Sequence, residues 1–242
     1  MLNKFLVYVT IILFLNTAKV LSSDDIPVLV IAPSKKPQSI STVGTSVVVL
    51  DENFLQNSSE YFLGDVLASN TTSANFFQNG GHGSSSAIQL RGLPKRYSTV
   101  YIDGVKMSDP SSVSGDYDFN HILTSQISRV EILKGNQSSV YGSGAIGGTI
   151  NITTKKGQPG KKKSVMFNTG SHKTNNYSIS FSGANEEDNY YVGFERFQTE
   201  GMSAMTHNDE KDGYKNNSLT ANYGKILSDN LNFKSNLRLT ET

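Results

Sequence analysis

Apolar and polar residues alternate along five stretches between residues 164 and 242. Strict alternation places one face of a β-strand in an apolar medium and the other face against polar groups or water. The apolar positions are Val165 and Phe167; Tyr177, Ile179 and Phe181; Tyr190, Val192 and Phe194; Leu219, Ala221 and Tyr223; and Leu231, Phe233, Leu237 and Leu239. Strands of a transmembrane β-barrel have this pattern, and so do strands of a soluble sandwich with one buried face.

The connections between these stretches alternate in length. Residues 184–189 and 226–230 read as tight turns, whereas residues 200–217 read as a long polar loop. Outer-membrane barrels have short turns on the periplasmic side and longer loops outside. The connections therefore favour a membrane barrel over a soluble sandwich.

The chain between residues 41 and 157 has short apolar runs separated by glycine and serine clusters, which are typical of strands and turns. A helix is predicted to begin at Asn57, where Glu60 stands three residues on as in a capping box, and to end near Asn70. Its apolar face would hold Phe62, Leu63, Val66 and Leu67. The sequence thus predicts an α+β domain, a basic linker over residues 158–163, and antiparallel β-strands of an incomplete transmembrane β-barrel over residues 164–242.

Residues 1–22 have the features of a cleaved secretory signal peptide. Lys4 precedes an apolar run from Phe5 to Leu15, and the small Ser22 is a suitable cleavage position. The run is too short to span a bilayer, which takes about 17–25 residues in a helix. The sequence therefore predicts export. No later segment is apolar enough for a transmembrane helix, so any membrane crossing would use strands.

Residues 24–40 form a proline-bracketed leader around one apolar run. That run is Val28, Leu29, Val30, Ile31 and Ala32. Proline cannot donate a backbone hydrogen bond, and it holds the preceding residue in extended geometry. We expect a tethered extended peptide, neither helical nor part of a sheet interior, that can add as a strand to the sheet of a partner.

Composition and motifs exclude several classes of function. The 22 Lys+Arg and 21 Asp+Glu residues give a net charge of +1, which lacks the basic excess of a nucleic-acid binder. Cysteine is absent, so disulfides and thiolate metal sites are excluded. The GxGxxG spacing of Gly142–Gly147 precedes a β-branched alternating run rather than the helix that a dinucleotide site needs. The histidines are scattered and no nucleophile motif is present, so we expect no enzyme and no required cofactor.

Ordered motifs along the chain resemble those of TonB-dependent outer-membrane receptors, with the cobalamin and siderophore transporters as nearest relatives. Asn136 departs from the family pattern, which has proline after the glycine. The motifs are the leader run 28–32, Gln89-Leu90-Arg91-Gly92, Ile102-Asp103-Gly104-Val105, the segment from Arg129 to Gly135, and the segment from Val140 to Ile152.

The resemblance implies a plug domain inside a barrel of about 22 strands. Residues 28–32 would be the TonB box, which the periplasmic domain of TonB pulls. The ligand would be bulky and scarce, either cobalamin or a ferric chelate, and the barrel would lie in the lipid of the outer membrane.

The resemblance also implies binding residues. Loop residues Asn79, Gly80, Gly81, His82, Val113 and Ser114 would contact the ligand. The charged plug residues Arg91, Asp103, Arg129 and Glu131 would pair with each other or with the barrel wall, since buried charges persist when paired. Asn208, Glu210 and Asp212 place oxygen ligands at alternate positions, which could hold calcium, although Lys211 opposes it.

Length bears on how much of such a protein is present. At about ten residues a strand, a wall of 22 strands needs roughly 220 residues before any loop. Only 82 residues follow Gly160 (242 − 160), so we expect a plug and about the first five strands. The alternative is an exported soluble or surface β-rich domain that binds a ligand or partner without transport. A soluble domain would have to bury the alternating aromatic residues.

Overall fold

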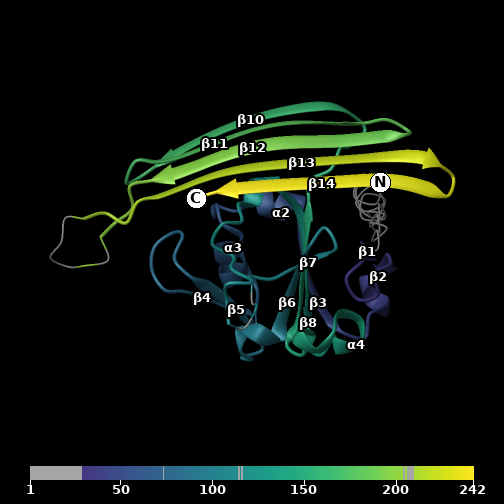
Figure 1. Cartoon of the computed structure of the whole chain (residues 1–242), viewed down its shortest axis with the longest axis horizontal. Helices are drawn as coiled ribbons and strands as arrows, with labels where there is room; N and C mark the ends of the chain where they lie inside the picture. Colours follow the sequence, from purple (N-terminus) through teal and green to yellow (C-terminus); the bar gives the residue numbers. More distant parts are fainter. Residues whose placement is uncertain (1–28, 73, 114, 116, 204, 206–209) are drawn as a thin grey trace, which may run out of the picture.

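The computed structural model describes residues 29–72, 74–113, 115, 117–203, 205 and 210–242. The predicted signal peptide, Val28, Ser114 and Asn208 lie outside the described residues. An N-terminal α+β domain packs beneath one curved sheet of long strands (Figure 1).

The N-terminal domain is built on a mixed sheet with the strand order β3-β8-β9-β6-β7. Strands β6 and β9 pair in parallel, and the other neighbours pair antiparallel. A separate hairpin is formed by β4 and β5. The strands are β3 (Ser46–Asp51), β4 (Ala74–Gln78), β5 (Ser86–Leu90), β6 (Ser98–Ile102), β7 (Val105–Met107), β8 (Ile127–Lys134) and β9 (Gly148–Thr154).

The helix predicted over residues 57–70 is present only as α3 (Leu63–Asn70), and a second short helix, α2 (Glu52–Asn57), ends where it was predicted to begin. The predicted capping box at Asn57 is wrong. Asp51 caps α2 by accepting the Phe54 N–H at 2.8 Å, and α3 has no side-chain cap. Phe62 instead forms a β-bridge with Leu123, a contact between distant segments that holds the chain extended before α3. The predicted end at Asn70 is confirmed.

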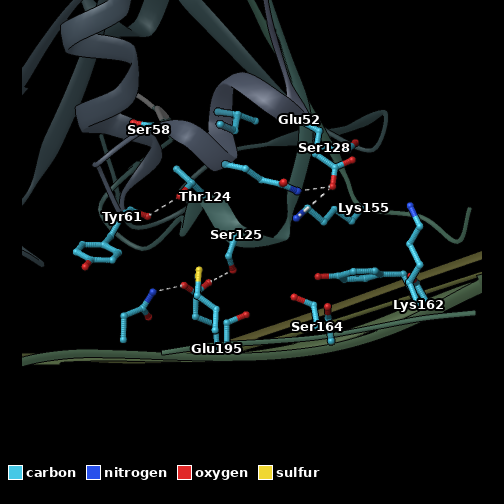
Figure 2. A pocket seen from close by; sticks show the side chains of 18 of the residues that line it. Glu52, Ser58, Tyr61, Thr124, Ser125, Ser128, Lys155, Lys162, Ser164 and Glu195 are labelled. Carbon is cyan, nitrogen blue, oxygen red and sulfur yellow. Dashed lines mark hydrogen bonds and ion pairs between the residues drawn. The ribbon is translucent and has the colours of Figure 1, made fainter. Parts of the chain in front are cut away.

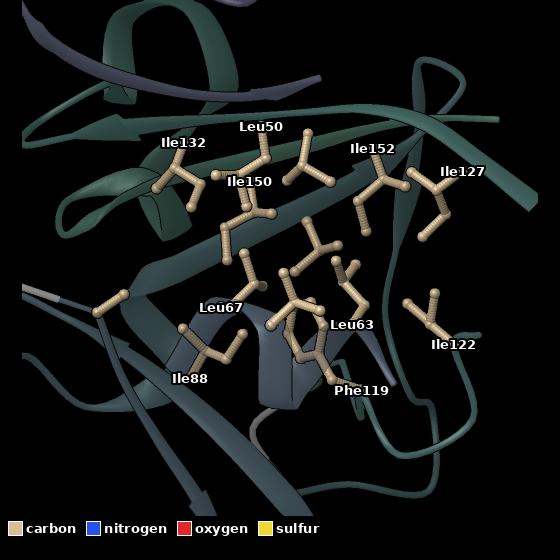
Figure 3. Close-up of a cluster of buried hydrophobic side chains, with 14 of the residues drawn as sticks. Leu50, Leu63, Leu67, Ile88, Phe119, Ile122, Ile127, Ile132, Ile150 and Ile152 are labelled. Atoms are coloured by element: carbon tan, nitrogen blue, oxygen red, sulfur yellow. The ribbon is translucent and has the colours of Figure 1, made fainter. Parts of the chain in front are cut away.

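The core lies between α3 and the mixed sheet (Figure 3). Leu63 and Val66 on the helix are fully buried against Val130, Ile132 and Ile150 on the sheet. Burying a side chain of this size contributes about 1.5–3 kcal/mol. The apolar face predicted for the helix is therefore what attaches it to the sheet.

The glycine run before β9 serves close packing. A strand follows it, as predicted, so the helix that a dinucleotide site requires is absent from this described segment. At Gly148, with φ +149°, a Cβ would lie 2.2 Å from the Leu133 carbonyl oxygen. Only glycine tolerates both that backbone conformation and that approach.

The second sheet has five long antiparallel strands in chain order. β10 begins at Gly160, so most of the predicted linker 158–163 is already strand. The turns after β11 and β13 are short, and the connection between β12 and β13 is long, as predicted. The strands are β10 (Gly160–Gly170), β11 (Thr174–Ala184), β12 (Asp188–Thr199), β13 (Tyr214–Ser228) and β14 (Leu231–Glu241).

This sheet turns its polar face inward and its apolar face outward. Glu195, on the inner face, is 1% exposed, whereas Phe181 and Val192, on the outer face, are 43% and 42% exposed. A soluble sandwich would bury the apolar face, so the sandwich interpretation is wrong. The buried polar residues of the inner face are Asn176, Glu195, Asn216, Ser218, Thr220 and Asn222.

No helix in the part of the chain that the structure describes is long and apolar enough to cross a membrane.

Candidate functional site

The leader was predicted to be a tethered extended peptide, but its described part is a hairpin docked on the domain, with bends and turns over residues 31–36. β1 (Leu29–Val30) pairs antiparallel with β2 (Gln38–Ser39) in a two-stranded ribbon. Val30 and Ala32 are 0% and 3% exposed, and Ile31 between them is half exposed. Within the described part of the predicted box, Val30 and Ala32 therefore face the domain and Ile31 faces outward.

Glu131, on strand β8 beside the central strand β9, holds the backbone of the leader. Its carboxylate accepts the Ile31 N–H at 3.0 and 3.2 Å and the Ala32 N–H at 2.7 Å. Arg129 Nε lies 2.8 Å from the same carboxylate. The Tyr141 hydroxyl donates to the Ala32 carbonyl. Side chains therefore satisfy, just beyond β1, the backbone groups that a neighbouring strand would otherwise satisfy.

The other two predicted plug charges lie in different surroundings. The Asp103 carboxylate accepts the Thr154 N–H at 3.0 Å and the Thr154 hydroxyl at 2.6 Å, which ties the β6–β7 turn to the end of β9. Arg91 is exposed at a positive φ of 55°. Within the described residues neither forms an ion pair with Arg129 or Glu131. The structure therefore joins two of the four predicted charged residues.

The predicted ligand loop lies against an aromatic cluster at the start of β13. The His82 ring stacks on Phe62 with centroids 4.7 Å apart and meets the edge of Phe197 at 5.4 Å. Tyr214 packs against Phe62, and its hydroxyl is hydrogen-bonded to His121 Nδ1 at 2.8 Å. Partial burial lowers the pKa of His82, and the nearby Asp65 carboxylate opposes this.

Three of the other predicted ligand residues, Asn79, Gly80 and Gly81, are exposed beside this cluster. Val113 is fully exposed on a separate loop. Asn79, Gly80 and Gly81 are accessible from the end of the sheet that carries the long loop, since a Cβ on Gly81 would lie 4.0 Å from Asp212 in that loop.

The leader and the ligand loop lie at opposite ends of the domain (Figure 1). Gly83, beside His82, approaches the ring of Tyr214 at the long-loop end of the sheet. Ile31 and Ala32 instead line a cavity of about 400 Å³ with Gly224 and Lys234, near the short turn between β13 and β14. The domain thus separates a loop face from a leader face.

Polar contacts join the domain to the sheet between these two faces. Ser125 of the domain donates to the carboxylate of Glu195 on β12 (Figure 2). Within the sheet, Asn176 Nδ2 donates to the same carboxylate at 2.9 Å. Gln126 Nε2 donates to the Ser218 carbonyl at 3.2 Å. A cavity of about 590 Å³ opens beside Glu195. Sequence reasoning missed Glu195, because nothing local distinguishes it from other inward-facing polar residues.

An ion-pair cluster connects the β10–β11 turn to the long β12–β13 loop at the same end of the sheet. The Glu200 carboxylate pairs with Lys173 and, at 2.6 Å, with Lys211. Hydrogen bonds from Lys173 and Lys211 lower the pKa of Glu200 to about 2. Lys211, which stands between the predicted calcium ligands Glu210 and Asp212, is therefore directed to Glu200. Among the described residues, no group of three or more acidic, histidine or cysteine side chains is placed to hold a metal ion.

Comparisons with known proteins agree with this geometry. Residues 39–149 match the TonB-dependent receptor plug domain family. The vitamin B12 transporter BtuB of Vibrio vulnificus (strain CMCP6) is 28% identical over 229 residues, which cover 93% of this chain and 36% of BtuB. The chain thus spans about a third of the length of this relative.

Solved structures share the fold. The ferripyoverdine receptor of the outer membrane of Pseudomonas aeruginosa matches with a TM-score of 0.74 and 16% identity, over 88% of this chain and 27% of that receptor. The siderophore receptor PirA from Acinetobacter baumannii matches with a TM-score of 0.63 and 20% identity, over 80% and 31%.

The fold and the matches define a plug domain followed by antiparallel strands of a partial barrel wall. Residues 39–149 therefore form a plug domain of the TonB-dependent receptor type. The chain is similar to a vitamin B12 transporter and to siderophore receptors.

Proposed function

We propose that this chain is the plug and adjoining wall of an outer-membrane transporter that takes up cobalamin or a ferric siderophore. The periplasmic domain of TonB would supply the energy by binding the leader run 28–32 as an added strand. The observation that carries the proposal is the docked leader, whose Ile31 and Ala32 N–H groups are held by Glu131. Those are backbone groups that a strand-adding partner would need, so docking and partner binding compete.

The arrangement of the two faces supports the direction of transport. Long loops of such barrels lie outside the cell and short turns face the periplasm. The loop holding Asn79 and His82 would then face the ligand, and the leader would face TonB. Exposed, glycine-rich backbone suits a large ligand with many amide groups, because it offers donors and acceptors without steric demand. The apolar outer face of the sheet fits lipid, and residues 1–22 would direct export and be cleaved.

Calcium in the long loop is a further part of the proposal. Glu210 and Asp212, with Asn208, would supply oxygen ligands, and Lys211 would have to stay on Glu200. Calorimetric titration with calcium tests it, and an absence of heat at millimolar calcium would leave the loop a solvated one.

The transport proposal is tested with the complete gene product that carries this chain. Cells producing it should take up labelled cyanocobalamin or a labelled ferric chelate. Leu29→Pro should abolish uptake and leave ligand binding intact, because proline removes a donor and blocks strand addition. Leu29→Ala is the matched control, since it keeps the backbone donor and should retain uptake.

Two outcomes would count against the proposal. Uptake that persists in Leu29→Pro would refute the coupling role of the leader. Failure of the complete protein to bind cyanocobalamin, with ferric chelates bound, would remove cobalamin as the ligand.

A further inference from the structure

The outer face of the second sheet carries an apolar band whose extent can be read from the strand register. One cross-strand row is apolar throughout: Val165, Ile179, Phe194, Leu219 and Leu239. Towards the long loop the band ends within one row. That boundary row is Phe167, Tyr177, Arg196, Asn217 and Glu241.

The other edge of the band runs obliquely across the strands. On β10 the apolar run stops at Val165, and the next outward positions towards the short turns are Lys163 and Lys161. On β14 the outward positions in that direction are Leu237, Ser235, Phe233 and Leu231, which are apolar except for Ser235. Strands of membrane barrels tilt by roughly 35–45° from the barrel axis. A band edge that crosses the strands obliquely therefore runs parallel to the membrane plane. This places Lys161 and Lys163 beside the apolar band at headgroup depth.

Lys161 and Lys163 are available to a ligand. Both are exposed on the outer face, and no ion pair of either is found among the described residues. Lys162, on the opposite face, donates to Gln158 at 2.7 Å. Asp188, an acidic residue at the short-turn end of β12, is already engaged by the Tyr223 hydroxyl at 2.7 Å and by Lys225 at 3.7 Å.

We propose that Lys161 and Lys163 bind the phosphate group of an anionic phospholipid in the leaflet on the short-turn side. The two side chains are two residues apart on one strand face, about 7 Å. Each can lay its aliphatic stem on the apolar band and direct its ammonium to the headgroup. The adjoining Val165 and Phe181 provide apolar surface for the acyl chains, which selects an amphiphile over free phosphate. The inference rests on the proposed membrane location.

The experiment uses the complete gene product in nanodiscs of phosphatidylcholine with or without phosphatidylglycerol. Native mass spectrometry after mild extraction measures how much of each lipid stays bound. Basic residues near an anionic surface contribute about 1 kcal/mol each, so Lys161→Gln with Lys163→Gln should weaken phosphatidylglycerol retention about 30-fold. Lys215→Gln is the matched control and should leave retention unchanged. Lys215 is exposed on β13 at the long-loop end of the same sheet.

The outcomes separate this inference from the proposed function. Unchanged phosphatidylglycerol retention in the double variant overturns the lipid site. Equal loss in Lys215→Gln also overturns it, because the effect would then be a general charge effect. Displacement of the lipid by inorganic phosphate alone would assign the lysines to free phosphate and refute the proposal. Failure of the protein to enter nanodiscs would refute the membrane location and the lipid site together.

Discussion

Replacing Glu131 by glutamine tests whether this carboxylate holds the leader on the plug. Glutamine keeps the shape of the side chain and one carbonyl oxygen, but it removes the negative charge. The two N–H groups of Ile31 and Ala32 would then have a neutral acceptor in place of a buried carboxylate. We expect the leader to spend more time undocked.

The size of the effect follows from the two hydrogen bonds. A hydrogen bond to a charged group contributes about 1.5–3 kcal/mol, against about 0.5–1.5 kcal/mol for a neutral one. The Glu131 side chain is 5% exposed, so solvent screening reduces the difference little. Over two bonds the loss is about 2–3 kcal/mol, which corresponds to roughly 30- to 150-fold in the ratio of undocked to docked leader.

Hydrogen exchange of the peptide that contains Ile31 and Ala32 measures that ratio directly, because these amides exchange when the leader opens. The complete gene product is compared with its Glu131→Gln variant in the absence of ligand. Exchange of β8 must stay slow, which shows that the plug remains folded. Glu52→Gln is the matched control. Glu52 forms an ion pair with Lys155 at 3.3 Å and does not contact the described part of the leader.

One result would refute the reasoning. If the leader amides exchange at the original rate in a folded Glu131→Gln plug, the carboxylate does not hold the leader. The competition between docking and partner binding would then have no basis at this residue.

Three further predictions concern single residues. Tyr141→Phe removes the donor to the Ala32 carbonyl and should speed leader exchange roughly fivefold, since a neutral hydrogen bond contributes about 1 kcal/mol. Burial raises the pKa of the Tyr141 hydroxyl above its usual 10.0. The stabilisation from its hydrogen bond is therefore complete below pH 10.0 and is lost only as pH rises through the folded pKa. The effect of Tyr141→Phe on leader exchange should be equal at about pH 7 and 9. Gly148→Ala should destabilise the plug by more than about 3 kcal/mol in thermal unfolding, whereas Gly44→Ala, whose Cβ would meet nothing within 4 Å, should be neutral; equal unfolding midpoints would contradict the packing argument. The pKa of Glu200 is lowered from 4.5 to about 2, so the stabilisation from its pairs with Lys173 and Lys211 is complete above about pH 5 and is lost progressively as pH falls to about 2. Proteolysis of residues 200–213 should therefore accelerate between about pH 4 and 2, and a rate that is constant over that range would contradict it.

The wall strands were predictable because each residue reports its own environment. Tyr177, Ile179 and Phe181 point outward and their polar neighbours point inward, so a period of two is visible without any knowledge of the partner strands. The helix was misplaced for the opposite reason. Its start depends on the bridge between Phe62 and Leu123, which lie far apart in the sequence.

The candidate site divides in the same way. The charges of Arg129 and Glu131 stand in a recognisable motif, but Glu131 acts on backbone groups 99 and 100 residues away. Glu195 and its partner Ser125 are 70 residues apart, and no local pattern connects them.

Local sequence patterns determined the strands and the glycine-dependent turns, because alternation and glycine act through neighbouring residues. Only the tertiary structure decided that the leader is docked, that Glu131 holds it, and that Glu195 joins plug to wall. Those features depend on burial and on hydrogen bonds between distant segments. A charged hydrogen bond such as that of Glu131 stabilises the fold only once distant segments come together and exclude water around it.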